Sequence, residues 1–254
     1  MCRVRKRVPD PKPRLRVSGG RRLTDETERI AGAYRRYARD GTERWSLANR
    51  GNRMALRERQ RAVKAVLGPM GLLPLGARRV LDVGCGAGAE MARLVELGAE
   101  PSALTGIELL PERVASAHER FPELDVRAGN AEHIGWPDAS FDLVLAYTVF
   151  SSILDNVMAR NVAAEIDRVL KPGGVLLWYD FRYDNPRNPN VRKMSESMVR
   201  SLFPAFRGEL RPITLLPPLS RRLGVMARML YPAMAALPGL RSHLLGALVK
   251  DGHT

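Results

Sequence analysis

The sequence predicts an α/β fold in which helices cover both faces of a mostly parallel sheet. Short apolar runs typical of buried strands, such as 80–83, alternate with segments whose apolar residues recur at helical spacing, such as 89–98. Strands that alternate with helices imply right-handed crossovers between parallel neighbours. The first run also ends in three alternate glycines, Gly84, Gly86 and Gly88, ahead of a helix. A strand, a glycine turn and a helix form the first unit of a nucleotide-binding sheet.

Length and charge limit the organisation of the chain. Its 254 residues accommodate one large α/β domain, or one domain with a small appendage. The formal net charge is +14, and residues 1–22 contain nine Arg or Lys and a single acid. We predict a disordered basic tail over 1–27, a helical cap over 28–72 and a main domain over 73–254. The basic balance is compatible with nucleic acid or an anionic membrane surface, but the tail has no aromatic residue for base stacking.

Cysteine usage and hydropathy favour a cytoplasmic protein. Cys2 and Cys85 form neither a disulfide framework nor a CxxC metal motif. The first residues are charged but lack the apolar core of a secretory signal, and no uninterrupted apolar run reaches membrane-spanning length. We therefore expect a reducing compartment and no bound metal.

Two helices are predicted ahead of the glycine turn. Thr24 or Asp25 caps the first helix, which stops at Asp40 and Gly41. The second helix covers 52–67. We expect the arginines between its apolar positions to face solvent.

The glycine turn alone leaves two cofactors open. Gly84-x-Gly86-x-x-Ala89 satisfies the loose dinucleotide fingerprint, so an NAD(P)-dependent oxidoreductase is one interpretation. Asp82, two residues before the first glycine, favours the other. A carboxylate at the strand end repels a pyrophosphate and attracts an ammonium or sulfonium group, both of which S-adenosylmethionine carries.

The run Val80-Leu-Asp-Val-Gly-Cys-Gly-Ala-Gly88 resembles the first motif of class I S-adenosylmethionine-dependent methyltransferases of the type 11 kind. The resemblance extends over residues 75–180. It implies a Rossmann-like sheet of seven strands with strand seven antiparallel, and S-adenosyl-L-methionine as the cofactor. The turn residues that would bind this cofactor are Gly84, Cys85, Gly86 and Gly88.

Three further strand ends are expected to complete the cofactor site. Glu108 follows a strand at 103–107 and lies 22 residues after Gly86, so its carboxylate can accept hydrogen bonds from both ribose hydroxyls. The family usually carries an acid against the adenine amine after the third strand, where this chain has an amide that can still accept from that amine. The remaining cofactor contacts expected at the ends of the third and fourth strands are Asn130, Ala131, Glu132 and Tyr147.

The acceptor site is predicted in the segment 179–190, which follows the fifth strand and is rich in aromatic and hydrogen-bonding residues. A hydroxyl acceptor would benefit from a base, whereas an amine or carboxylate need not have one. The candidate bases, in order of preference, are Asp180, His133 and Tyr183.

The C-terminal third is expected to close the sheet with strands at 213–216 and 243–249, the second of them antiparallel as the resemblance implies. Between them an insertion at 217–240 carries an apolar helical stripe. Three roles remain open for it: a cap on the acceptor pocket, a contact with a second subunit, or peripheral membrane contact through 221–237. The oligomeric state does not follow from the sequence.

These features together predict methyl transfer from S-adenosylmethionine to a small molecule, sugar or lipid-linked acceptor. Two rivals stay open: an NAD(P)-dependent oxidoreductase, and a non-catalytic RNA-associated module on the same fold. An Asn-Pro-Pro-Tyr motif, common after the fourth strand of base-modifying amino methyltransferases, is replaced here by Tyr147-Thr-Val-Phe150. A nucleic-acid substrate is therefore not favoured.

Overall fold

The computed structural model describes residues 25–40 and 46–252. The predicted tail lies outside these residues, apart from its last three, which begin helix α1 (Asp25–Arg39). Helix α2 (Arg50–Leu67) starts two residues earlier than predicted. It does so because the Asn49 side chain caps it by accepting hydrogen bonds from two backbone N–H groups of its first turn, at 2.9 and 3.2 Å.

One mixed sheet organises the chain, in the order β3-β2-β1-β4-β5-β8-β6, with β7 also paired to β8. The first five strands are parallel, whereas β8 runs antiparallel to β5, β6 and β7. This confirms the predicted Rossmann-like, mostly parallel sheet with an antiparallel strand near its C-terminal end. The predicted strands six and seven are β7 and β8, and the two-residue β6 is an addition. The bounds are β1 Val80–Val83, β2 Leu104–Glu108, β3 Asp125–Ala128, β4 Phe141–Tyr147, β5 Leu170–Phe181, β6 Phe206–Arg207, β7 Arg211–Leu215 and β8 Arg241–Lys250.

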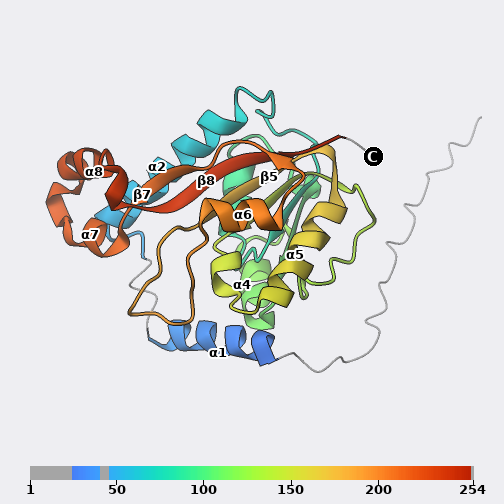
Figure 1. Cartoon of the computed structure of the whole chain (residues 1–254), viewed down its shortest axis with the longest axis horizontal. Helices are drawn as coiled ribbons and strands as arrows, with labels where there is room; N and C mark the ends of the chain where they lie inside the picture. Colours follow the sequence, from blue (N-terminus) through green and yellow to red (C-terminus); the bar gives the residue numbers. More distant parts are fainter. Residues whose placement is uncertain (1–24, 41–45, 253–254) are drawn as a thin grey trace, which may run out of the picture.

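Helices pack on both faces of the sheet, and each face has its own hydrophobic core. One core joins the sheet to α5 (Asn156–Val169), α6 (Glu196–Leu202) and part of α1. Figure 1 shows α5 and α6 together on this side. The other core joins the sheet to α2, α3 (Ala89–Val95) and α4 (Pro111–Arg120).

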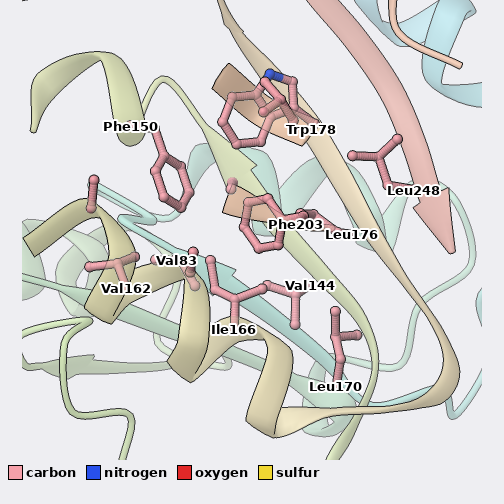
Figure 2. Packing of buried hydrophobic residues seen from close by; sticks show 14 of the residues in the cluster. Val83, Val144, Phe150, Val162, Ile166, Leu170, Leu176, Trp178, Phe203 and Leu248 are labelled. Atoms are coloured by element: carbon pink, nitrogen blue, oxygen red, sulfur yellow. The ribbon is translucent and has the colours of Figure 1, made fainter. Parts of the chain in front are cut away.

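Helix α5 illustrates how the apolar pattern fixes these layers. Its buried residues include Val162, Ile166 and Val169, which recur at helical spacing. Figure 2 shows Val162 and Ile166 directed toward Val83 and Val144 of the central strands. The face that α5 buries therefore lies under the two strands whose carboxyl ends carry the predicted site.

The insertion between β7 and β8 is folded differently from the single helix that its apolar stripe predicts. It forms α7 (Pro217–Arg222), a 3-10 turn and α8 (Ala227–Ala235), with Gly224 at a positive φ of 51° between the helices. Figure 1 shows α7 and α8 projecting beyond one end of the sheet. Tyr231 and Ala235 pack inward against Leu215, so the rest of the stripe is divided between this small core and solvent.

The topology brings several chain segments to one edge. The carboxyl ends of β1, β2, β4 and β5 meet there, together with the first residues of antiparallel β8. Open α/β sheets bind ligands at this edge. Within the described residues, no helix combines the length and the hydropathy needed to cross a bilayer.

Candidate functional site

The glycine turn follows β1, and its backbone has a conformation that residues with a side chain rarely adopt. Gly84 and Gly86 have φ values of 69° and 59°. A Cβ at Gly84 would lie 3.0 Å from the Val149 side chain, and one at Gly86 would lie 2.7 Å from the Arg113 guanidinium. The turn can therefore carry little but glycine at these positions, and its main chain is open to close approach by a ligand.

Asp82 lies buried beneath this turn, with 2% of its surface exposed. Its Oδ2 atom has no hydrogen-bond partner among the described residues. Burial, reinforced by the carboxylates of Glu90 and Glu108, raises the pKa of Asp82 well above its ordinary value. A ligand that brings a positive charge to this spot would offset both effects.

Glu108 ends β2 beside the turn and is almost fully buried. Its Oε2 accepts a hydrogen bond from Gly86 N at 2.8 Å, and its Oε1 accepts one from Leu110 N at 3.0 Å. Arg113 lies 3.6 Å from Oε2. These bonds fix the carboxylate at the edge of the cavity, and each oxygen keeps a further lone pair for a ligand.

A cavity of about 1530 Å³ extends over this edge of the sheet. Its walls come from α1, α2, the strand ends, the segment after β5 and the start of α7. The predicted site residues that line it are Gly84, Glu108, Asn130, Ala131, Tyr147 and Tyr183. Those that lie outside its lining are Asp82, Cys85, Gly86, Gly88, Glu132, Asp180 and His133.

Some of the predicted residues outside the cavity lining support the residues that form it. The Gly86 amide fixes Glu108, and Gly88 caps α3 at a φ of 78°. Cys85 contributes its backbone to the turn, while its thiol is buried and burial raises the thiol pKa. Asp82 can influence a ligand through its charge beneath the turn.

The Asn130 and Glu132 side chains bind each other. Glu132 N donates to Asn130 Oδ1 at 3.0 Å, and Asn130 Nδ2 donates to Glu132 Oε2 at 3.0 Å. The second oxygen of Glu132 accepts from Asn161 at 2.8 Å. Glu132 therefore holds the turn in shape, while Asn130 and Ala131 face the cavity.

The three candidate bases occupy very different positions. Asp180 is fully buried, its two oxygens accept from Ser151 N at 2.9 Å and Phe181 N at 2.8 Å, and burial raises its pKa to about 6. His133 lies exposed outside the cavity. Tyr183 lines the cavity with 40% of its surface exposed. Of the three, only Tyr183 can contact a ligand there without rearrangement.

Arg59 of α2 is a cavity residue that the sequence pattern misses, since the arginines of this helix were expected in solvent. Its guanidinium pairs with Glu90 of α3 and lies 5.2 Å from the Tyr147 ring centre and 5.0 Å from that of Tyr179. The two tyrosine rings are 5.5 Å apart. This cluster places a positive charge beside the ends of β4 and β5.

His243, at the start of β8, is a second unforeseen cavity residue. Its ring stacks on Tyr179 at 4.4 Å with an interplanar angle of 3°, and lies 4.3 Å from the Phe181 ring. Burial, with a further contribution from Arg59, lowers the pKa of His243 to about 3, so the ring is neutral at neutral pH. The sequence shows this residue only as the first position of a strand.

Helix α1 closes the cavity on the side away from α2. Tyr34 shares a hydrogen bond with Ser152 at 3.0 Å, and its ring lies 5.0 Å from the Arg113 guanidinium. Tyr37 donates to Asn188 Oδ1, at 2.9 Å, in the segment after β5. The helix thus spans the cofactor side and the predicted acceptor side.

These residues fit a nucleoside that carries a cationic group. Glu108 offers lone pairs beside an open glycine turn, which suits vicinal hydroxyls. The Asp82 Oδ2 atom is buried and has no hydrogen-bond partner among the described residues, so a cationic group placed above it would favour the ionised form of this carboxyl. No group of three His, Cys, Asp or Glu in the described residues is arranged to bind a metal.

The chain resembles known methyltransferases over its central part. Residues 81–178 match the family model described as a methyltransferase domain. The chain is 36% identical over 119 residues to phthiotriol/phenolphthiotriol dimycocerosates methyltransferase 1 of Mycobacterium ulcerans, covering 44% of this chain and 40% of that protein. It is 32% identical over 131 residues to demethylmenaquinone methyltransferase of Chlorobaculum parvum, covering 51% of each. The chain therefore matches about half the length, or less, of these relatives.

A solved structure extends the similarity of fold. It is the complex between the Haloferax volcanii Trm112 methyltransferase activator and its proposed methyltransferase. The match has a TM-score of 0.57 and 20% identity, and covers 82% of this chain and 96% of that one. At this identity the similarity concerns the arrangement of helices and strands.

Proposed function

Because residues 81–178 constitute a class I S-adenosylmethionine-dependent methyltransferase domain, we propose that the whole chain transfers the methyl group of S-adenosylmethionine to a small, largely apolar acceptor. The observation that carries this proposal is the buried Asp82 carboxyl beneath an open glycine turn, whose Oδ2 has no hydrogen-bond partner among the described residues, with Glu108 beside it. A cationic nucleoside satisfies both groups. The cofactor supplies an electrophilic methyl carbon, and the chain aligns the acceptor and excludes water.

We assign the cofactor contacts by position. Glu108 receives the ribose hydroxyls, and Asn130 with Ala131 lies against the adenine. Asp82 balances the positive charge from beneath the turn. Arg59 pairs with Glu90 near the turn, where its guanidinium also suits the carboxylate of the methionine portion.

The acceptor side of the cavity supports an apolar substrate. Its walls carry aromatic and aliphatic side chains, including Tyr179, Phe181 and Leu216. The names of the relatives point the same way, since one acts on phthiotriol dimycocerosates and another on demethylmenaquinone. We propose a lipid-like alcohol, quinol or comparable small molecule as the acceptor class.

The insertion supports a second proposal, contact with an anionic membrane surface. Between Glu209 and Asp251 the sequence contains no acid, while Arg222 and Arg228 are exposed. Lipid surfaces attract such combinations of basic and apolar side chains. Most of the exposed large hydrophobic side chains gather on this insertion and the nearby cavity rim, namely Leu47, Val225, Met226, Met229 and Leu237.

The rivals fit the site less well. A dinucleotide would place its pyrophosphate beside the buried Asp82 carboxyl and the carboxyl group of Glu90. An RNA-associated role would rest on the basic tail, which lies outside the described residues. Location in the cytoplasm remains a proposal based on the cysteine pattern.

Calorimetry followed by a methyl-transfer screen tests the proposed function. We expect S-adenosylmethionine and S-adenosylhomocysteine to bind the full chain with one site, and NADH to give no heat. Tritiated S-adenosylmethionine should then label a component of a bacterial lipid or small-molecule extract. Binding of NADH in place of S-adenosylmethionine, or RNA binding with steep salt dependence and no cofactor uptake, would overturn the proposal.

A further inference from the structure

We propose that His243 is the catalytic base of the methyl transfer and that the acceptor group is a hydroxyl. The inference rests on the proposed function, because it assigns a role within the same cavity. It comes from a geometry that three distant segments of the chain create together: the end of β5, the end of β7 and the start of β8.

The strand direction brings His243 to the reactive edge. Since β8 is antiparallel, its first residues lie beside the last residues of β5, and His243 stands opposite Phe181 in the sheet. In the sheet order β1-β4-β5-β8, strands β4 and β5 separate His243 from the glycine turn that follows β1. His243 therefore lines the part of the cavity that the cofactor residues leave free.

A hydrogen-bond relay fixes the tautomer of the ring. The Ser242 hydroxyl donates to the Thr214 carbonyl oxygen at 3.0 Å. With its hydrogen used there, Ser242 Oγ can only accept from His243 Nδ1, which lies 2.8 Å away. Nδ1 therefore carries the hydrogen, and Nε2 carries the lone pair.

The surrounding residues hold the ring in this orientation. Tyr179 stacks flat on it, and Phe181 lies against it at 4.3 Å. The Tyr179 hydroxyl is itself anchored to Thr214 Oγ1 at 3.0 Å. Thr214 thus holds both Ser242, through its carbonyl oxygen, and Tyr179, through its hydroxyl. Its φ of 65° is unusual for a β-branched residue and marks a strained position.

The chemistry requires a proton acceptor at this place. The acceptor oxygen forms its bond to the methyl carbon as the carbon–sulfur bond breaks, and the electron pair of that bond stays on sulfur. The oxygen then carries both the new methyl group and its original hydrogen, which makes it a much stronger acid than an imidazolium. A weakly basic imidazole is therefore sufficient, and the proton passes to Nε2 of His243 and then to solvent.

Charged and titratable neighbours favour the release of that proton. The Arg59 guanidinium opposes a second positive charge at His243. Tyr147 and Tyr179 lie beneath Arg59, and burial raises the pKa of both hydroxyls, so both are neutral at neutral pH. His243 is thus the group in this cluster that is free to accept a proton and then lose it.

Nitrogen NMR of the full chain tests the tautomer without any acceptor. With labelled histidine, we expect His243 to be neutral from pH 5 to 9, with the hydrogen on Nδ1 and a bare Nε2. Ser242→Ala should remove this preference. An Nε2-protonated ring, or an imidazolium near pH 7, would overturn the inference.

Kinetics test the base. His243→Phe keeps the aromatic contacts but has no nitrogen, and His243→Gln offers an acceptor atom without basicity. We expect kcat to fall about 10²–10³-fold in both, the lower part of the range that a general base contributes, while S-adenosylhomocysteine binds with unchanged affinity. The exposed His118, whose Nε2 lies 2.8 Å from the Val126 carbonyl, supplies the matched control His118→Gln, which should behave like wild type.

The product also decides the acceptor class. We expect the tritiated methyl group transferred by the wild type to be bound to oxygen. A product methylated on nitrogen or carbon, or a His243→Phe protein with wild-type kcat, would overturn this inference and leave the proposed function intact. A chain that binds S-adenosylmethionine and methylates nothing would overturn both.

Discussion

The two halves of the cavity are built in opposite ways. On the cofactor side, Asp82, Gly84 and Glu108 come from two successive strands and lie within 27 residues of sequence. The acceptor side is lined by His243 of β8, and Arg59, where the two halves meet, comes from a helix almost two hundred residues earlier. The cofactor side is thus a local motif of strand ends, whereas the acceptor side exists only once α2, β5 and β8 have assembled around it. Changes in the two halves should therefore have separable effects.

The largest expected effect on cofactor binding is that of Glu108→Gln. Both carboxylate oxygens accept from backbone N–H groups, so the amide NH2 of Gln must face a donor and the turn loses one bond. The hydrogen bonds to the ribose hydroxyls are weakened as well, so we expect a loss of about 2–3 kcal/mol of binding free energy. Calorimetry should then show roughly 30–150-fold weaker binding of S-adenosylhomocysteine. The exposed residue Glu119 supplies the control Glu119→Gln, and equal affinities of the two variants would contradict the assignment.

Asp82→Asn should weaken cofactor binding about 10- to 100-fold and at the same time stabilise the free protein. The variant removes a buried carboxyl whose pKa is raised by burial and by Glu90 and Glu108. Relief of such a functional strain typically adds about 1 kcal/mol to the free energy of unfolding. Thermal unfolding with and without S-adenosylmethionine measures both effects. The exposed Asp125→Asn is the control, and a variant that is destabilised yet binds normally would refute the prediction.

The same carboxyl predicts a pH dependence. Because the pKa of Asp82 is raised in the free protein, part of the population is protonated, and a bound cation favours the ionised form. Binding should therefore release protons, and affinity should increase as pH rises toward the pKa of the free protein. Calorimetry in buffers of different ionisation enthalpy measures the release. It should disappear in Asp82→Asn, and its persistence there would assign it to another group.

Arg59→Met tests the point where the two halves meet. The variant removes one of the two arginine partners of Glu90 and the cation above Tyr147, and we expect about 10-fold weaker cofactor binding, in line with one charged hydrogen bond of about 1.5 kcal/mol. Arg57, exposed on the same helix, provides the control Arg57→Met. If Arg59 instead faces solvent, as the helical pattern suggests, the two variants will bind equally well.

The smallest effect on cofactor binding is expected at the insertion. Val225→Ser with Met229→Ser should leave calorimetry with S-adenosylhomocysteine unchanged, because both side chains are exposed away from the cavity. Sedimentation with vesicles of phosphatidylglycerol and phosphatidylcholine should show several-fold weaker binding than wild type. The control is Val157→Ser on α5, which is also exposed but lies apart from the insertion. Unchanged vesicle binding, or a shift from dimer to monomer, would contradict the membrane proposal.

Sequence reasoning reached the fold because it depends on short-range patterns. Strand periodicity, the glycine turn and the Glu108 spacing predict the parallel sheet, and its strand order confirms the fold class. The roles of the individual site residues remain predictions. The division into a tail, a cap and a main domain also remains one.

Arg59 and His243 escaped prediction for a physical reason, whereas most of the segment 179–190, predicted as the acceptor site, lines the cavity. An arginine on an amphipathic helix looks solvent-exposed until a sheet end covers it, as β4 and β5 cover Arg59. Asp180 lies near the end of a strand, where catalytic residues are common, yet the alternation of the strand turns it inward onto backbone N–H groups. In the sequence, His243 looks like an ordinary strand residue. Its hydrogen-bond relay through Ser242 depends on Thr214 of β7, and no short-range pattern links β7 to His243.

A crystal structure of the full chain with S-adenosylhomocysteine would test the cofactor assignment most directly. We predict that the adenosine lies between the ends of β1 and β2, with both ribose hydroxyls on the Glu108 carboxylate and the amino-acid portion above Asp82. Adenosine bound elsewhere in the cavity, or a Glu108 carboxylate that contacts only Gly86, Leu110 and Arg113, would contradict the assignment.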